Sequence, residues 1–371
     1  MIILFARSVF ISVCMSLLPI NVVFALEPGE SIVLDPVTCN YTLTYSDQLD
    51  DGSKILSQAT FVPATKIVPT LDSKFYLNQA GTVTYSYSVS SGAQSRQILT
   101  TVRFDLAGKV VGSQDLPTDM KTSTVEQAFA VLAANEQALS TPTGWRGAIS
   151  TNKSGESRIS WHPDRSAAGI PPKGHLKGFG FRSQSLPGLD VAQFEGNSGI
   201  LGYGGEGPDP DSDIAKQIQV LEQNDFVPRK AAVPVIAVPI PFDAAALLGS
   251  IQAQTHKWIA MNLLDATFST QLDRYFQSAI SAYRLNQPRV GMQQIEALRA
   301  LIRKEQPDMG RDEEHESDRS HEKNDDGQTP LIDKLAARVL DFDLSYVTKR
   351  MDEGAHERED GEHKPASQIE R

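Results

Sequence analysis

The chain has 371 residues, 40% of them hydrophobic, so it can bury enough apolar surface for two domains of ordinary size. Its formal net charge is −11, whereas binding to a phosphate backbone calls for a basic surface. The charge is concentrated near the C-terminus: residues 306–329 contain nine acidic and three basic residues, and residues 352–371 contain seven and three. We expect a disordered acidic insertion and a disordered acidic tail beside a nearly neutral body.

Residues 1–25 have the pattern of an export signal. Arg7 is followed by an apolar run, and the segment ends in the small residue Ala25, which predicts cleavage after that position. The alternative is an uncleaved membrane anchor, but Pro19 and Asn21 interrupt the run well before the roughly 20 apolar residues that a span needs. No later stretch is apolar over that length. We therefore expect a secreted chain, periplasmic or extracellular, with no membrane span after cleavage.

Neither of the two cysteines predicts a lipid anchor, an internal disulfide or a reactive thiol. Cys14 lies inside the signal, and it follows Val13 where lipid attachment would call for a small residue. Removal of the signal leaves Cys39 alone, so the mature chain cannot form an internal disulfide even in an oxidising compartment. Cys39 falls in an alternating segment, where we expect a small buried side chain in preference to a reactive thiol.

The segment after the signal has the pattern of an antiparallel β domain, residues 26–226. Residues 82–90 alternate Val and Tyr with small polar residues, and residues 97–106 follow a Ser-Ser-Gly turn, so the two segments predict one hairpin. Further strands are expected at residues 31–35, 40–44, 146–151, 158–161, 176–183 and 189–194. One helix is expected at residues 124–139. Many short strands with Gly and Pro between them favour a sandwich.

The sequence KGFGF, residues 177–181, matches the start of the aromatic strand with which RNA-recognition modules stack bases. The match ends there, because Phe181 is followed by Arg182 and polar residues, and no second aromatic strand lies in a β-α-β-β-α-β pattern. We therefore expect no nucleic-acid partner. The pattern of this segment favours a strand with a bulge at Gly178, in which Phe179 and Phe181 point to the same face.

Residues 196–199, GNSG, resemble the nucleophile turn of chymotrypsin-like serine proteases, which makes Ser198 the one catalytic candidate. That mechanism also needs a histidine base held by an acid. His162 and His175 are the only upstream histidines, and both lie too close to Ser198 in sequence to come from a preceding complete barrel. The glycines that follow favour a loop, and we expect no catalytic residue here.

Three aspartates alternate in the sequence DPDSD, as the first ligands of a calcium loop do: Asp209, Asp211 and Asp213. The sixth position of such a loop should be Gly and is Ile214, and the closing acid is replaced by Val220. The alternative is capping of a short helix, residues 214–223, since acidic residues favour the amide-rich end of a helix. We expect no metal or cofactor, with calcium at these aspartates as the only candidate.

Beyond the β domain, prolines at four positions of residues 227–242 argue against a helix or a central strand and predict an extended linker. The hydrophobic period then becomes helical. Asp243 is expected to cap a helix that runs to about residue 264, a second helix covers residues 270–285, Pro288 begins a third, and residues 331–351 form a fourth. The result is a small helical bundle, residues 243–351, with the acidic insertion inside it. His315 and His321 of that insertion lie among carboxylates, but almost no apolar residue is present to order them as metal ligands.

The stretch QLDRYFQSAISAYRLNQPRVGMQQIEALRALIRKE resembles the helical hairpin of FIMAH-type modules, which are appended to exported bacterial proteins. The places that carry the resemblance are Leu272, Ala279, Asn286, Leu298 and Ile302. The chain departs from the usual pattern with Gly where the family has Ala after the turn, and with an acidic insertion before the last helix. The resemblance covers about 80 residues, and it implies an accessory or interaction role, no catalytic residues and a bacterial source.

These observations predict an α+β chain of two domains, an antiparallel β-sandwich-like domain followed by a small helical bundle. We expect an exported, non-enzymatic protein that binds an unknown extracellular or envelope ligand or attaches to a surface. The alternative is a hydrolase of an envelope or extracellular polymer, which would need two acids roughly 5 to 10 Å apart for glycoside chemistry.

Overall fold

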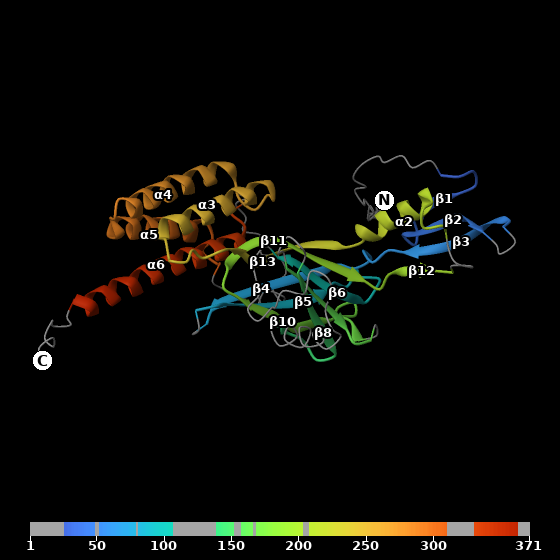
Figure 1. Cartoon of the computed structure of the whole chain (residues 1–371), viewed down its shortest axis with the longest axis horizontal. Coiled ribbons are helices and arrows are strands. Elements are labelled where there is room, and N and C mark those ends of the chain that lie inside the picture. Colours follow the sequence, from blue (N-terminus) through green and yellow to red (C-terminus); the bar gives the residue numbers. More distant parts are fainter. Residues whose placement is uncertain are drawn as a thin grey trace, which may run out of the picture.

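The chain has an α+β architecture, with three antiparallel sheets followed by helices on the C-terminal side (Figure 1). The computed structural model describes residues 26–48, 52–78, 81–106, 139–151, 157–165, 168–202, 208–309 and 330–362. The expected export signal, the expected helix at residues 124–139 except for its last residue, and most of the acidic insertion lie outside these ranges. Within them, no helix combines the length and the apolar character that a membrane span requires.

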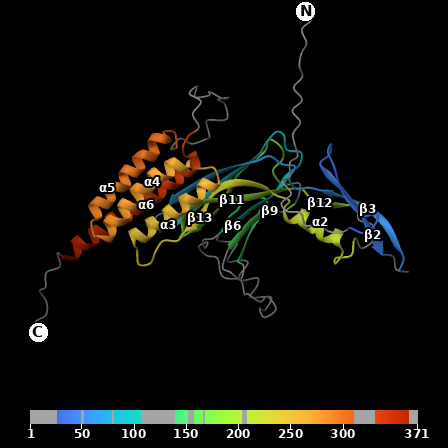
Figure 2. The same ribbon diagram turned by 90° about the horizontal axis from the view of Figure 1, so that it is seen from above.

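Sheet A, at one end of the molecule, consists of β1, β2, β3 and β12 in that order (Figure 2). Its strands are β1 (Ser31–Asp35), β2 (Asn40–Gln48), β3 (Lys54–Val62) and β12 (Gly199–Leu201). Helix α2 (Asp213–Gln223) covers one face of the sheet, where Ile214 and Ile218 pack on Leu43, Tyr45 and Phe61. Sheet A and α2 therefore have a small hydrophobic core of their own.

Two further sheets pack against each other through aromatic side chains. Sheet B has the order β4 (Pro69–Leu77), β5 (Val83–Ser91), β10 (His175–Ser183) and β7 (Leu139–Ser140). Sheet C has the order β13 (Val227–Ile236), β11 (Leu186–Gly196), β6 (Leu99–Leu106), β9 (Ser157–Pro163) and β8 (Trp145–Thr151). The rings of Tyr87 and Phe104 lie 4.6 Å apart, and those of Trp145 and Phe179 lie 5.2 Å apart. Such pairs fill the space between the two sheets.

The hairpin expected from residues 82–90 and 97–106 is wrong, although both segments are strands. β5 pairs with β4 and β10 in sheet B, whereas β6 pairs with β11 and β9 in sheet C. The connection between them crosses from one sheet to the other, and Gly92 and Arg96 donate backbone hydrogen bonds to Val68 and Lys66 on the way. Both strands alternate because each faces the shared core, and alternation carries no information about the pairing partner.

The Pro-rich segment is extended, as expected, but most of it is no linker. Residues Val227–Ile236 form β13, which pairs with β11 from Phe194 opposite Val227 to Leu186 opposite Ile236. β13 is the edge strand of sheet C, and an edge strand tolerates proline because one side of it needs no hydrogen-bonded neighbour. Only residues 237–242 connect the sheet to the first helix of the C-terminal part.

Four helices follow: α3 (Ala244–Ala260), α4 (Ala266–Arg284), α5 (Pro288–Glu305) and α6 (Lys334–Glu362). All four start within four residues of the expected positions, but α6 continues to Glu362, eleven residues beyond its expected end and into the segment expected to be a disordered tail. The Asp243 carboxylate accepts a hydrogen bond from the amide of Ala246, which confirms the expected cap, and Pro288 occupies the first turn of α5. α4 begins four residues earlier than expected because Asp265 caps it at the amides of Thr267 and Phe268.

Helix α6 contacts both the sheets and the other helices. Towards sheet B, the ring of Phe342 meets that of Phe75 edge-on at 5.2 Å, and Arg338 donates to the carbonyl of Ser73 at 3.2 Å. Lys230 of β13 pairs with Asp333, just before the helix. The buried side chains of sheets B and C and of the four helices consequently form one continuous cluster.

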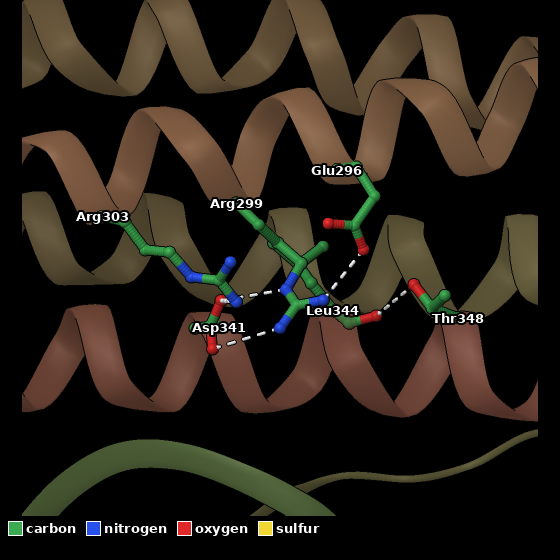
Figure 3. A network of polar contacts seen from close by, with 6 residues as sticks. All are labelled: Glu296, Arg299, Arg303, Asp341, Leu344 and Thr348. Carbon is green, nitrogen blue, oxygen red and sulfur yellow. Dashed lines mark hydrogen bonds and ion pairs between the residues drawn. The ribbon is translucent and has the colours of Figure 1, made fainter. Parts of the chain in front are cut away.

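Towards α5, α6 is held by a network of ion pairs (Figure 3). Arg299 donates to Asp341 at 2.9 Å and to Glu296 at 2.8 Å, and Arg303 reaches the same oxygen of Asp341 at 3.1 Å. One turn further along α6, Thr348 donates to the carbonyl of Leu344. The Arg299 side chain is only 15% exposed, whereas that of Arg303 is 49% exposed.

We expect the two arginines to contribute unequally to stability. Arg299→Ala should lower the free energy of unfolding by about 1 to 3 kcal/mol, because it removes charge-assisted hydrogen bonds from a largely covered site. Arg303→Ala is the matched control and should cost less than about 1 kcal/mol, as exposed ion pairs do. Denaturant unfolding of the two variants measures both values, and equal losses would contradict this account.

Candidate functional site

Ser198 lies exposed in the turn between β11 and β12. The turn is held in place by Asn197, whose amide donates to the carbonyl of Ile98 and whose carbonyl accepts from the side chain of Gln97 at 2.6 Å. No histidine or carboxylate of the described ranges is hydrogen-bonded to the Ser198 hydroxyl. The described residues therefore bring no base to this serine, and its catalytic role remains an untested hypothesis.

The three aspartates expected either to bind calcium or to cap a helix have separate partners. Asp209 accepts from the amide of Asp211 at 2.9 Å, and Asp213 pairs with Lys216 at 3.2 Å. The cap of α2 is Ser212, which accepts from the amide of Ala215. In the part of the chain that the structure describes, no three His, Cys, Asp or Glu side chains converge as metal ligands do. The capping interpretation thus describes the start of this helix, and calcium remains untested.

The aromatic residues of KGFGF belong to the core. Phe179 and Phe181 are buried between sheets B and C, and neither ring can stack on a base while the core stays closed. The register of β10 against β5 shifts between Lys177 and Phe179, where Gly178 has a φ of 104°, so the expected bulge is confirmed. Gly180 is required for a different reason, since a Cβ there would lie 2.5 Å from the carbonyl oxygen of Tyr85.

The outer face of sheet C carries a polar cluster that the sequence analysis missed. The register places Arg103 opposite Gln193 and Thr101 opposite Glu195. Arg103 donates to Gln193 through Nε at 2.6 Å and lies 3.2 Å from Glu195. We call Thr101, Arg103, His162, Gln193 and Glu195 the sheet C cluster. The alternation of the strands does predict outward polar positions, but only the pairing of β6 with β9 and β11 brings these positions together.

His162 is the titratable group at the rim of this cluster. Its Nδ1 lies 3.3 Å from the hydroxyl of Thr101. Partial burial lowers the pKa of His162, the negative charge of Glu195 opposes that shift, and the positive charge of Arg103 adds to it. The imidazole is therefore neutral at neutral pH and can act only as a hydrogen-bonding group or a weak base there.

Asp225 lies beside the cluster, in the connection between α2 and β13. Burial raises its pKa to about 6, against the effect of the amide of Ala64, which donates to the carboxylate at 2.5 Å. The negative charge of Glu195 raises the pKa further. A carboxyl group with such a pKa can exchange a proton near neutral pH, but here one of its oxygens already fixes the chain between β3 and β4.

The outer face of sheet A, the face turned away from α2, is the second candidate. Backbone register places Val33, Thr42, Thr60 and Leu201 in one row across all four strands. The two ends of this row are exposed apolar side chains, Val33 at 57% and Leu201 at 62%. Leu56 lies on the same face and is also exposed. This face offers methyl and hydroxyl groups to solvent and has no charged side chain in the row.

An open groove lies on the helical part of the described surface. It is lined by Ala266, Thr267, Thr270, Gln271, Arg274, Tyr275 and Leu301. Its single charged side chain and its open form give it neither the enclosure nor the converging polar groups of a small-molecule site.

The raised pKa of Asp225 predicts a specific dependence of stability on pH. The folded state binds this proton more tightly than the unfolded state does, so the wild type should gain stability as the pH falls from about 6 towards 3.8. Asp225→Asn cannot titrate, so the difference in unfolding free energy between variant and wild type should shift in favour of the wild type over this interval. Parallel denaturant titrations at pH 7, 5.5 and 4 measure this difference. A difference that is independent of pH would contradict the assignment.

Comparison with known proteins adds no family. No protein-family model matches the chain, and no curated protein matches its sequence. The resemblance of the helical hairpin to FIMAH-type modules therefore remains a prediction.

Proposed function

We propose that this is an exported, non-enzymatic binding or surface-attachment protein whose contact surface is the outer face of sheet A. The observation that carries the proposal is the uneven distribution of exposed apolar side chains. Of the thirteen large hydrophobic side chains that are exposed in the described residues, six lie on sheet A or its first turn. Three of these share the outer face, Val33, Leu56 and Leu201, whereas Leu34 and Ile55 lie on the other face and Val37 lies in the turn. Apolar side chains gathered on one small surface are typical of interaction sites, whereas single ones are not.

The make-up of this face favours an uncharged ligand surface. The row from Val33 to Leu201 contains hydroxyl and methyl groups, and the next row includes Thr44 and Gln58. Such a surface can desolvate without burying an unpaired charge, which is the costly step in association. These two rows offer no charge to a phosphate or a metal ion, and the charged side chains of the same face, Asp35 and Lys54, lie at the ends of their strands, where Lys54 pairs with Glu27. An envelope or extracellular polymer, or the surface of another macromolecule, has the required chemistry.

We further propose that the β domain and the helices have different roles. The division into a sandwich-like β domain and a helical bundle, expected from the sequence, remains a proposal, with the helices as an accessory module of FIMAH type. The continuous core that links sheets B and C to the helices supports a rigid body from which sheet A, with its separate core, projects (Figure 1). Export of the chain from a bacterial cell rests on the expected signal alone.

A hydrolase is the second candidate, and one observation favours it. Asp225, with its pKa near 6, is close enough to Glu195 for the two carboxylates to interact. A pair of neighbouring acids is a common arrangement in glycoside hydrolysis. Against this, Glu195 is paired with Arg103, and Asp225 is bound to the backbone of Ala64. These partners favour a structural role.

Retention of the mature chain on insoluble envelope and extracellular polymers, and on intact bacterial cells, tests the proposal. We expect Val33→Ser combined with Leu201→Ser to reduce retention at least tenfold, because the substitution removes apolar contact without changing the charge. The matched control is Leu285→Ser combined with Val290→Ser, which changes two exposed apolar side chains of the helical part and should leave retention intact.

Equal loss of retention in both double variants, or no loss in either, would contradict the assignment to sheet A. Release of soluble fragments from a polymer by the wild type, abolished by Asp225→Asn, would support the hydrolase in place of the binding protein.

A further inference from the structure

Asp343 of α6 is a buried acid without a partner. Its side chain is 0% exposed, and neither carboxylate oxygen has a hydrogen-bond partner among the residues that the structure describes. A buried polar group without a hydrogen bond costs free energy, and an ionised one costs far more. The neighbouring acid on the same helix, Asp341, shows the contrast, because it is held by Arg299 and Arg303 (Figure 3).

Asp343 lies at the contact between α6 and the sheets. α6 packs on β11, and Phe342, the preceding residue, meets Phe75 of sheet B. Burial raises the pKa of Tyr85 in sheet B well above its usual value, and the charges of Tyr87 and Asp343 add to the shift, so Asp343 and Tyr85 interact electrostatically. The Tyr85 hydroxyl donates to the carbonyl of Ser185 at 3.0 Å, in the turn between β10 and β11.

Five cations on the elements around α6 and on α6 itself have partners other than Asp343. On α5, Arg299 and Arg303 bind Asp341. On β13, Lys230 pairs with Asp333, and Arg229 donates to the carbonyl of Pro69. Arg338 of α6 itself reaches the carbonyl of Ser73 and lies over the ring of Phe75.

Three further titratable groups on or near these elements also have partners. On β5, Tyr87 donates to the carbonyl of Ala232 at 2.7 Å. On α3, His256 binds Asp273, and on β11, Asp190 accepts from the amide of Val191. Ionisation of Asp343 would therefore place an uncompensated negative charge between the helix and the sheets.

We propose that the contact between α6 and the sheets is a pH-dependent latch, which is closed while the Asp343 carboxyl is neutral and loosens when that carboxyl ionises. An ionised carboxylate needs water or a cation, and no cation of the described residues binds the Asp343 oxygens. Separation of α6 from the sheets lets water reach the group. The same movement exposes the apolar faces that Phe75 and Phe342 cover.

The sign of the effect follows from burial. Burial raises the pKa of Asp343 well above 3.8, so the closed state binds the proton more tightly than the open state, in which water reaches the group. Above the ordinary pKa of an aspartate, each further pH unit therefore shifts the ratio of closed to open states about tenfold towards the open state, until the pKa of the closed state is passed. The latch weakens as the pH rises.

Hydrogen exchange of the mature chain, followed on peptides of α6 between pH 5 and 9 and corrected for the intrinsic exchange rate, tests the latch. In the wild type, the opening equilibrium of α6 should rise by up to tenfold per pH unit. Asp343→Asn and Asp343→Leu should both remove that dependence, and the second variant keeps the test valid if the amide of the first is poorly accommodated. Asp341→Asn serves as the control that keeps Asp343 and should retain the dependence.

A wild-type opening equilibrium that stays constant over this range would overturn the proposal. So would a pH dependence that persists in both variants of Asp343.

Discussion

The packing of α6 is the contact on which the rest of this structure depends. One side of the helix meets sheet B through Phe342 and Arg338, and another side meets α5 through Asp341. Because its side chains are buried on both sides, α6 fuses the core between sheets B and C with the core of the helices. Each large apolar side chain buried in this way contributes roughly 1.5 to 3 kcal/mol. Neither part could lose the helix without exposing apolar surface of the other.

This arrangement explains why the acids of α6 behave differently and why sheet A is separate. Asp341 is bound by two arginines that compensate for its loss of water, whereas Asp343 is fully buried and has no hydrogen-bond partner in the described residues. Sheet A has its core on the side of α2, and its other face carries the proposed contact surface. The proposed ligand surface and the proposed latch thus lie at different ends of the molecule.

Sequence patterns within one helix or strand predicted that element well, but the sequence did not predict which strands pair with each other. The alternation of residues 82–90, the bulge at Gly178 and the cap at Asp243 were readable because each depends on local geometry. β3 and β4 escaped prediction, since their inward and outward residues are less regularly polar and apolar. The prediction of a hairpin was wrong because a strand shows the same alternation whichever strand pairs with it. Strand β13 was missed because its prolines are acceptable only at a sheet edge. The exposed face of sheet A and the sheet C cluster are each formed by several paired strands, so no single sequence segment could predict them.

The most direct test of the central claim is residue-resolved hydrogen exchange under increasing denaturant at pH 5, where the proposed latch is closed. If α6 joins the sheets and the helices into one core, the most protected amides of β5, β6, α4 and α6 should exchange through a single opening with one free energy and one denaturant dependence. Sheet A, with its own core, is expected to open separately and earlier. Independent openings for the helices and for sheets B and C, each with its own free energy, would contradict the account.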